Sequence, residues 1–356
     1  MRKKAIKLLS VLVCAFMCVG LFVRCTRDKS TDKENADNKV ETTEEKNKDK
    51  LTKIRLNEVT RSIFYAPMYA AISEGFFEEQ GIEIELSTGQ GADKTMQQLI
   101  SRSVDIGFSG PEQVMYIYNQ GRDDYPVVFA QLTQKDGSFL VSRAKHNEFS
   151  WQDIKGKTVI GGRPGGVPEM ALEYVLKNEN IDKDKELNLV TNIAFDAVPG
   201  AFKGGTGDYA AIFEPTASII AKEINGSVVA SIGESAGNLP YTCFYAVKSY
   251  IDNNEELLVK FIKAIQKGQD WVMTNDDATV AASIKDFFPG TDEEVIATVV
   301  GNYKKIEAYA KTPVVNEEDM NRLMDIIESY DSELLTKRPP FKDIVDNSIS
   351  EKAMEK

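Results

Sequence analysis

Cysteine and histidine are scarce in this chain. After residue 50, the 356-residue sequence contains one cysteine, Cys243, and one histidine, His146. A disulfide needs a second cysteine, a conventional zinc site needs several convergent Cys or His ligands, and a nucleophilic cysteine needs a base beside it. These chemistries are therefore excluded for this part of the chain. We expect Cys243, in the strand-like stretch TCFYAV, to be a buried apolar side chain.

An excess of positive charge is also absent. The chain has 55 acidic and 43 basic residues and a formal net charge of −12. The first 24 residues contain five bases and no acid, so the acidic excess lies further along. Nucleic-acid binding needs a basic footprint, and we therefore expect no nucleic-acid partner.

Long apolar runs are limited to the start of the chain, where MRKKAIKLLSVLVCAFMCVGLFVRC places bases before an apolar stretch. This pattern predicts a signal or lipoprotein leader over residues 1–25. LFVRC resembles a lipobox, which predicts lipidation of Cys25, although Arg24 stands where a small residue is usual. An uncleaved anchor helix is the alternative, but the run is short compared with the roughly 20 residues that a span needs.

Residues 26–50 contain almost no apolar side chain apart from Val40. Such a segment cannot bury enough surface to offset the entropy of ordering. We expect a disordered tether that holds the remaining residues outside the membrane.

From residue 52 onward, short apolar or alternating stretches such as 54–59, 82–86 and 104–108 are separated by helical patterns. Further strands are expected near 127–130, 139–141, 158–160, 187–193, 210–213, 227–231 and 242–247. Residues 253–335 are almost entirely helical in pattern. Strands that alternate with helices predict an α/β fold with largely parallel sheets.

The glycine-rich stretch GGRPGGVPEM, residues 161–170, follows the strand-like KTVI. Neither the phosphate-binding spacing GxxxxGK[ST] nor the dinucleotide-binding spacing GxGxxG is present here. The stretch is predicted to be a turn that delivers the N-terminus of a helix, beginning at Pro168, to the end of a strand.

Several longer stretches together resemble one protein family. They are FYAPMYAAISEGFFEEQGIEIEL (64–86), GQGADKTMQQL with VDIGFSGP (89–111), DIKGKTV (153–159) and GDYAAIFEP (207–215). Gly75, Phe76, Phe77, Glu78, Glu79 and Gly81 carry the match in the first stretch. Over residues 52–275 the chain resembles solute-binding proteins of ABC importers for sulfonates, taurine, nitrate and pyrimidine precursors of thiamine.

The resemblance implies a two-lobed periplasmic-binding-protein-like fold of type II, with a mostly parallel sheet flanked by helices in each lobe and a helical C-terminal part. It places residues 52–134 and 241–335 in lobe 1, residues 135–240 in lobe 2 and residues 336–356 in a C-terminal tail. The implied protein is a cell-surface, lipid-anchored monomer without a cofactor. Its partners are a small-molecule ligand and an ABC permease with its ATPase.

The expected site lies where strand ends meet helix N-termini, because ligands of open α/β sheets bind there. The aromatic turn after the first strand is expected to be exposed, Asp93 to cap its helix, and Glu112 to suit the helix dipole. Arg163 could pair with an acidic ligand group or form an ion pair between the lobes. The predicted ligand-binding residues are Ser62, Phe64, Tyr65, Gly91, Ala92, Ser109, Gly110, Gln131, Asp136, Arg163, Gly165, Gly166, Glu214 and Tyr241.

One arginine, several carboxylates and aromatic side chains favour a planar, nitrogen-rich ligand such as a pyrimidine-type thiamine precursor. An anion of the alkanesulfonate, taurine or nitrate type is the alternative. An enzyme resembling thiamine-pyrimidine synthases is disfavoured, because that chemistry uses a histidine donor and a cysteine-rich motif. A secreted adhesin is a third possibility, against which only the cleft motifs argue.

Overall fold

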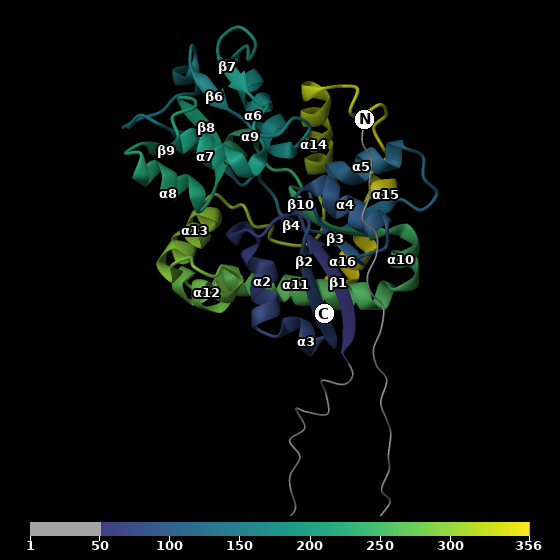
Figure 1. The fold of residues 1–356 in the computed structure, drawn as a ribbon. Helices are drawn as coiled ribbons and strands as arrows, with labels where there is room; N and C mark the ends of the chain where they lie inside the picture. The colour runs from purple at the N-terminus through teal and green to yellow at the C-terminus, as the bar shows by residue number, and fades with distance from the viewer. Residues whose placement is uncertain (1–50, 356) are drawn as a thin grey trace, which may run out of the picture. The chain divides into compact units, whose positions relative to one another are not determined.

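The strands of the computed structural model, which describes residues 51–355, form two five-stranded sheets (Figure 1). The first sheet has the order β2-β1-β3-β10-β4 and the second the order β7-β6-β8-β5-β9. The strands are β1 (Thr52–Glu58), β2 (Ile82–Thr88), β3 (Ile106–Ser109), β4 (Pro126–Thr133), β5 (Ser138–Ser142), β6 (Thr158–Ile160), β7 (Asn188–Val190), β8 (Tyr209–Phe213), β9 (Ser227–Ser231) and β10 (Thr242–Val247).

Both sheets have the same pattern of strand directions. In the first, β10 is antiparallel to β3 and β4, while β1 is parallel to β2 and β3. In the second, β5 is antiparallel to β8 and β9, while β6 is parallel to β7 and β8. One strand of five therefore opposes the rest in each sheet, and the prediction of mostly parallel sheets is confirmed.

The central strands are apolar because both of their faces are covered. Every residue of β4 and of β10 is buried. Such strands read as continuous apolar runs, whereas the outer strand β2 alternates buried and exposed positions at its start. In the first core, the Phe108 and Phe244 rings stack at 4.4 Å, and Phe244 meets Phe261 edge to face at 5.2 Å.

Helices flank the sheets and follow the predicted alternation. They are α2 (Ala66–Ser73), α3 (Phe76–Glu79), α4 (Ala92–Ile100), α5 (Glu112–Asn119), α6 (Val167–Asn178), α7 (Val198–Lys203), α8 (Thr216–Glu223), α9 (Ile232–Ala236), α10 (Lys248–Asn253), α11 (Glu255–Thr274), α12 (Asp277–Ile284), α13 (Glu293–Lys305), α14 (Glu317–Tyr330), α15 (Phe341–Ile344) and α16 (Asn347–Met354). Short 3-10 turns are η1 (Ile63–Tyr65), η2 (Trp151–Ile154), η3 (Phe195–Ala197) and η4 (Lys285–Phe287).

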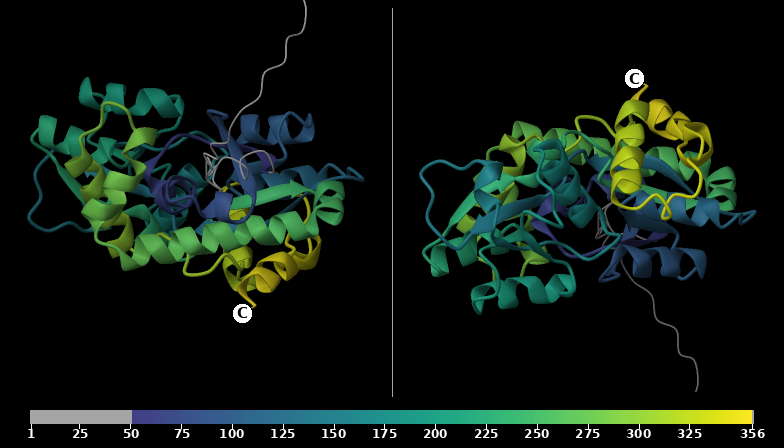
Figure 2. Two further views of the ribbon diagram at one scale, coloured as in Figure 1. Left: turned by 90° about the horizontal axis from the view of Figure 1, so that it is seen from below. Right: turned by 90° about the horizontal axis from the view of Figure 1, so that it is seen from above.

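The C-terminal helices pack on the first sheet. The long helix α11 contacts α2, α3 and α16, and α16 also packs on β4 (Figure 2). The stretch 336–356, expected as a tail, thus contains two helices, and Ile344 and Ile349 are buried within the core. Helix α14 instead packs against α6, which follows a strand of the second sheet.

The chain links the two sheets twice. Residues 134–137 connect β4 of the first sheet to β5 of the second, and residues 237–241 lead from α9 back to β10. Leu239 and Tyr241 donate backbone hydrogen bonds to Gln134 and Thr133, so the two links run side by side. The leader, the tether and Cys25 lie outside the described residues.

Candidate ligand-binding site

Five turns at the ends of parallel strands lead directly into helices. In the first sheet, β1 is followed by η1, β2 by α4 and β3 by α5; in the second, β6 is followed by α6 and β8 by α8. Helix N-termini leave backbone N–H groups without intrahelical partners, and these groups can face a ligand. The predicted site residues lie on these turns and on the two links.

The aromatic turn after β1 is buried, so its expected exposure is wrong. Phe64 is 0% and Tyr65 is 4% exposed. Ser62 caps the turn η1, since its Oγ accepts a hydrogen bond from the Phe64 N–H at 3.3 Å. The sequence around this turn could not indicate the burial, because the residues that cover it are distant in the chain.

Phe64 contacts both sheets and both links. Its ring centroid lies 4.6 Å from that of Tyr303, 5.7 Å from that of Tyr241 and 6.3 Å from that of Phe213. A Cβ atom on Gly137 would lie 2.7 Å from the Phe64 ring, so glycine is needed for this close approach. Phe64 therefore forms an apolar wall at the junction of the two sheets.

Asp136 lies in the first link and is fully buried. Its Oδ1 accepts a hydrogen bond from the Ser138 N–H at 2.8 Å, whereas its Oδ2 has no donor at hydrogen-bond distance among the described residues. Burial raises the pKa of Asp136 to about 6, and the charge of Asp136 contributes to the raised pKa of Tyr241. The Asp136 carboxyl group and the Tyr241 phenol are thus close neighbours at the site.

Glu112 is the residue whose role the sequence did not indicate. It begins α5, but it is 2% exposed and is therefore not a solvated partner of the helix dipole. Its Oε1 has only a 3.3 Å hydrogen bond from the Gln113 side chain, and its Oε2 has no partner among the described residues. Burial raises its pKa to about 7, against the opposing effect of the Arg163 charge. The only available signal was an acid directly after Gly-Pro at a strand end.

The turn that holds Glu112 is shaped around its carboxyl group. A Cβ atom on Gly110 would lie 2.0 Å from the Glu112 Oε2, so Gly110 leaves the space that this carboxyl group occupies. Ser109 pairs with Tyr245 across the sheet, with 2.5 Å between the two hydroxyl oxygens. Ser109 is therefore neither the helix cap nor a free ligand contact in this structure.

The glycine-rich stretch forms the predicted turn into a helix, with Gly166 as the N-cap of α6 and Gly165 at a φ of +73°. Arg163 Nη2 lies 3.9 Å from the Asp93 Oδ1 in α4. The interpretation of Arg163 as part of an ion pair between the sheets is thus the one that the contacts favour. Both side chains are about half exposed, and such pairs contribute roughly 0 to 1 kcal/mol.

Asp93 is not a helix cap, which corrects the sequence expectation. The N-cap of α4 is Gly91, at a φ of +148°, and no side chain caps this end; Ala92 is the first helical residue. The Asp93 side chain is instead directed to Arg163. The backbone amides after Gly91 are consequently left without a side-chain acceptor.

Two predicted residues are satisfied within the protein. Glu214 accepts hydrogen bonds from the Ser218 N–H and Oγ–H, at 3.0 and 2.6 Å, and from the Asn302 Nδ2 at 3.1 Å. Gln131 donates from its Nε2 to the Val314 carbonyl at 2.9 Å. Neither side chain is directed to a vacant partner, so the structure assigns them packing contacts.

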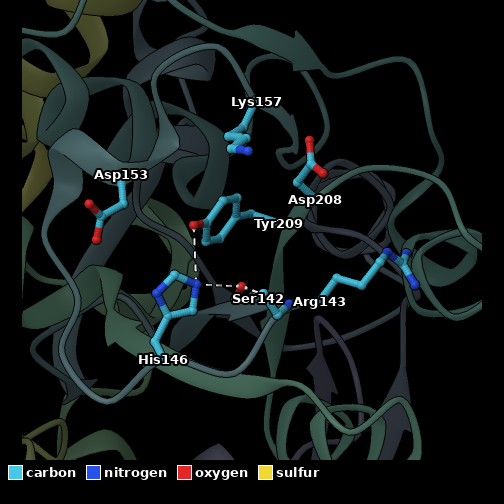
Figure 3. A pocket seen from close by; sticks show the side chains of 8 residues that line it. Ser142, Arg143, His146, Asp153, Lys157, Asp208 and Tyr209 are labelled. Atoms are coloured by element: carbon cyan, nitrogen blue, oxygen red, sulfur yellow. Dashed lines mark hydrogen bonds between the residues drawn. The ribbon is translucent and has the colours of Figure 1, made fainter.

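A surface depression of about 520 Å³ lies at a different place (Figure 3). It contains His146, whose Nε2 lies 3.0 Å from the Ser142 Oγ and 3.3 Å from the Tyr209 hydroxyl group. Ser142 ends β5 and Tyr209 begins β8, so this depression lies at the sheet edge opposite to the turns described above. It does not coincide with the predicted site.

Other kinds of site were also examined in the described part of the chain. Among residues 51–355, no three His, Cys, Asp or Glu side chains are grouped so as to hold a metal ion. No helix in the same range has the length and apolar character needed to cross a membrane.

Comparisons with known proteins agree with the geometry. A family model described as "NMT1/THI5 like" matches residues 63–279. The protein named "Putative binding protein YtlA" from Bacillus subtilis (strain 168) is 44% identical over 307 residues, which cover 86% of this chain and 91% of that protein. The chain belongs to the NMT1/THI5-like family.

Solved structures support the fold class. The periplasmic aliphatic sulphonate binding protein SsuA from Escherichia coli matches with a TM-score of 0.66 at 16% identity, over 83% of this chain and 92% of SsuA. The ligand-binding component of an ABC-type import system from Staphylococcus aureus matches with a TM-score of 0.65 at 12% identity, over 85% of this chain and 99% of that chain. The predicted periplasmic-binding-protein fold is confirmed, and the chain is a binding protein of the ABC-type import family, not an enzyme.

Proposed function

We propose that this protein is an extracytoplasmic lipoprotein that captures a small organic molecule between its two lobes and delivers it to an ABC permease. The lobes are the two sheets with their helices, the chain passes between them near residues 131–137 and 234–241, and the protein acts as a monomer. Closure around the ligand is a hinge movement driven by contacts that exist only in the closed state.

The proposed ligand is planar and nitrogen-rich, such as a pyrimidine-type thiamine precursor. The observation that carries this proposal is the placement of two buried carboxyl groups, Glu112 and Asp136, among the aromatic side chains Phe64, Tyr65 and Tyr241. The charges of both acids contribute to the raised pKa of Tyr65 and to that of Tyr241, so the four groups are near one another. Aromatic walls with a few placed polar groups are typical of small-molecule sites.

An anion of the alkanesulfonate, taurine or nitrate type is the alternative ligand, favoured by the name of the relative SsuA. Buried carboxyl groups oppose it, because they repel an anion in a site from which water is excluded. The single nearby cation, Arg163, is half exposed and already lies beside Asp93.

A thermal-shift screen of residues 46–356, which form one compact unit, tests the proposal. The panel contains a 4-aminopyrimidine thiamine precursor, taurine, an alkanesulfonate and nitrate. A ligand at 100 times its Kd should stabilise the protein by roughly 2.7 kcal/mol. A folded protein that responds to no compound would contradict the proposed function.

Two variants test the position of the site. Tyr65→Ala should weaken binding of the identified ligand by removing a wall, and Arg163→Ala should weaken it by removing the ion pair to Asp93. Isothermal titration measures both affinities. If neither variant changes the affinity, the site lies elsewhere.

The lipid anchor at Cys25 has a separate test. In cells that express the full chain, Cys25→Ser should move the protein from the membrane fraction to the released fraction. Cys18→Ser serves as the matched control and should leave the distribution unchanged. Retention of the Cys25→Ser protein in the membrane fraction would favour the uncleaved anchor helix.

A further inference from the structure

Corresponding acids follow equivalent strands of the two sheets. β3 and β8 both occupy the third place in their sheets, and each is followed by a proline-initiated helix: Ser109-Gly110-Pro111-Glu112 in one case and Phe213-Glu214-Pro215 in the other. Glu112 is 2% and Glu214 is 3% exposed. The two turns thus bury one carboxyl group each at the same edge of the fold.

The two acids differ in their hydrogen-bond partners. Glu214 accepts three hydrogen bonds from Ser218 and Asn302, so both of its oxygens are occupied. Glu112 has only the long contact from Gln113, and its Oε2 has no partner among the described residues. An unsatisfied buried polar group costs on the order of 1 to 3 kcal/mol, and more when it is charged. Such a group indicates either a missing partner or a functional role.

The space around Glu112 is preserved by the sequence. Gly110 has no Cβ atom, and an added one would lie 2.0 Å from the Glu112 Oε2. The neighbouring aromatic groups of Tyr65 and Tyr241 have phenols whose pKa values are raised, so they are neutral near pH 7 and bring no cation to the acid. Asp136, on the opposite side of Tyr241, supplies a second carboxyl oxygen without a donor at hydrogen-bond distance.

We propose that Glu112 is the residue that selects the ligand, by accepting hydrogen bonds from an amidine-type N–H group or a protonated aminopyrimidine, with Asp136 as the second acceptor. This assignment rests on the proposed function and makes its ligand class definite. The site takes neutral or cationic hydrogen-bond donors and rejects sulfonate and nitrate. Arg163 does not reverse this preference, because its guanidinium group is half exposed and lies 3.9 Å from Asp93.

Isothermal titration of residues 46–356 tests the assignment with defined probes. The donor probes are benzamidine and 4-amino-2-methylpyrimidine, and the anionic probes are methanesulfonate and nitrate. The wild-type protein should bind a donor probe, and Glu112→Gln should weaken that binding at least tenfold because an amide presents one acceptor oxygen and no charge. Asp136→Asn should weaken it by a smaller factor.

Two further variants separate the role of Glu112 from effects on the fold. Glu78→Gln removes an exposed acid on α3 and should leave the affinity within twofold of the wild type. Gly110→Ala retains the Glu112 charge but displaces its carboxyl group, and should therefore also weaken binding about tenfold. Circular dichroism monitors folding, and Gly110→Ala gives an independent result if Glu112→Gln does not fold.

The outcomes distinguish the two proposals. If methanesulfonate or nitrate binds the wild type, or if Glu112→Gln and Gly110→Ala both retain full affinity for a donor probe, the assignment of Glu112 is wrong while solute binding stands. If the folded wild type binds no probe of either kind, the ligand class of the proposed function fails, and this assignment fails with it.

Discussion

The hydroxyl group of Tyr303 donates a hydrogen bond to the carbonyl oxygen of Gly137 at 3.1 Å, although the two residues are 166 positions apart. The same oxygen accepts the Glu214 N–H at 3.3 Å. Tyr303 belongs to α13, and Gly137 belongs to the first link between the sheets. A C-terminal helix thus holds the backbone that carries Asp136 and Phe64 in register.

Tyr303→Phe should destabilise the protein by about 1 to 3 kcal/mol, because a buried carbonyl and a buried N–H group lose their partner. Urea unfolding measures the change. Tyr118→Phe, which removes a hydroxyl group bound to Asp343 at a partly exposed position, should cost less than about 1 kcal/mol. Equal effects of the two changes would contradict the bracing role of Tyr303.

Gly107→Ala should also destabilise the fold. A Cβ atom at this position in β3 would lie 2.3 Å from a ring carbon of Tyr245, which is fully buried in β10. Overpacking of this kind costs typically about 1 to 3 kcal/mol. The control is Gly200→Ala in α7, where nothing lies within 4 Å of the added atom; it should be neutral or stabilising. Differential scanning calorimetry compares the two, and an unchanged Tm for Gly107→Ala would refute the expected clash.

The stability of the ligand-free protein should fall as the pH rises from about 5 to about 8. Burial raises the pKa of Glu112 to about 7 and that of Asp136 to about 6, above the values of 4.5 and 3.8 expected for exposed groups. A group with a raised pKa stabilises the fold fully below its unfolded value, and this contribution is lost as the pH rises through the folded value. Each group contributes a slope of up to about 1.4 kcal/mol per pH unit.

Urea unfolding at several pH values measures this slope, and Glu112→Gln should reduce it. The groups that face Glu112 are Arg163, whose charge lowers its pKa, and Tyr65, Tyr116, Tyr241, Cys243 and Tyr245, which remain neutral in this range. The prediction fails if the wild type is equally stable at pH 5 and pH 8, or if Glu112→Gln shows the wild-type slope.

Cys243 should not react with a thiol reagent in the native protein. Its side chain is fully buried in β10, and burial raises the pKa of the thiol well above its usual value. Because the thiolate is the reactive form, labelling of residues 46–356 with Ellman's reagent should occur only after unfolding. Rapid labelling under native conditions would show that β10 opens locally.

Much of the fold could be predicted from the sequence because the determining signals are local. The alternation of short apolar stretches with helical patterns predicted strands that the structure contains, and glycines such as Gly166 indicated where a helix begins. The burial of Cys243 also followed from its apolar neighbours. The positions of helix caps were less predictable: Asp93 is one turn position inside α4 and its side chain extends to Arg163.

The sequence by itself thus determined the class of fold, the family and the absence of cysteine, histidine and nucleotide-binding chemistry, since these follow from composition and from motifs within single segments. Only the tertiary structure decided which polar groups are satisfied. Glu112 and Glu214 occupy similar sequence positions after a strand, yet Asn302 reaches only Glu214, and Phe64 is covered by Gly137, Phe213 and Tyr303. Burial and hydrogen-bond pairing depend on contacts between residues far apart in the chain, and no local pattern encodes them.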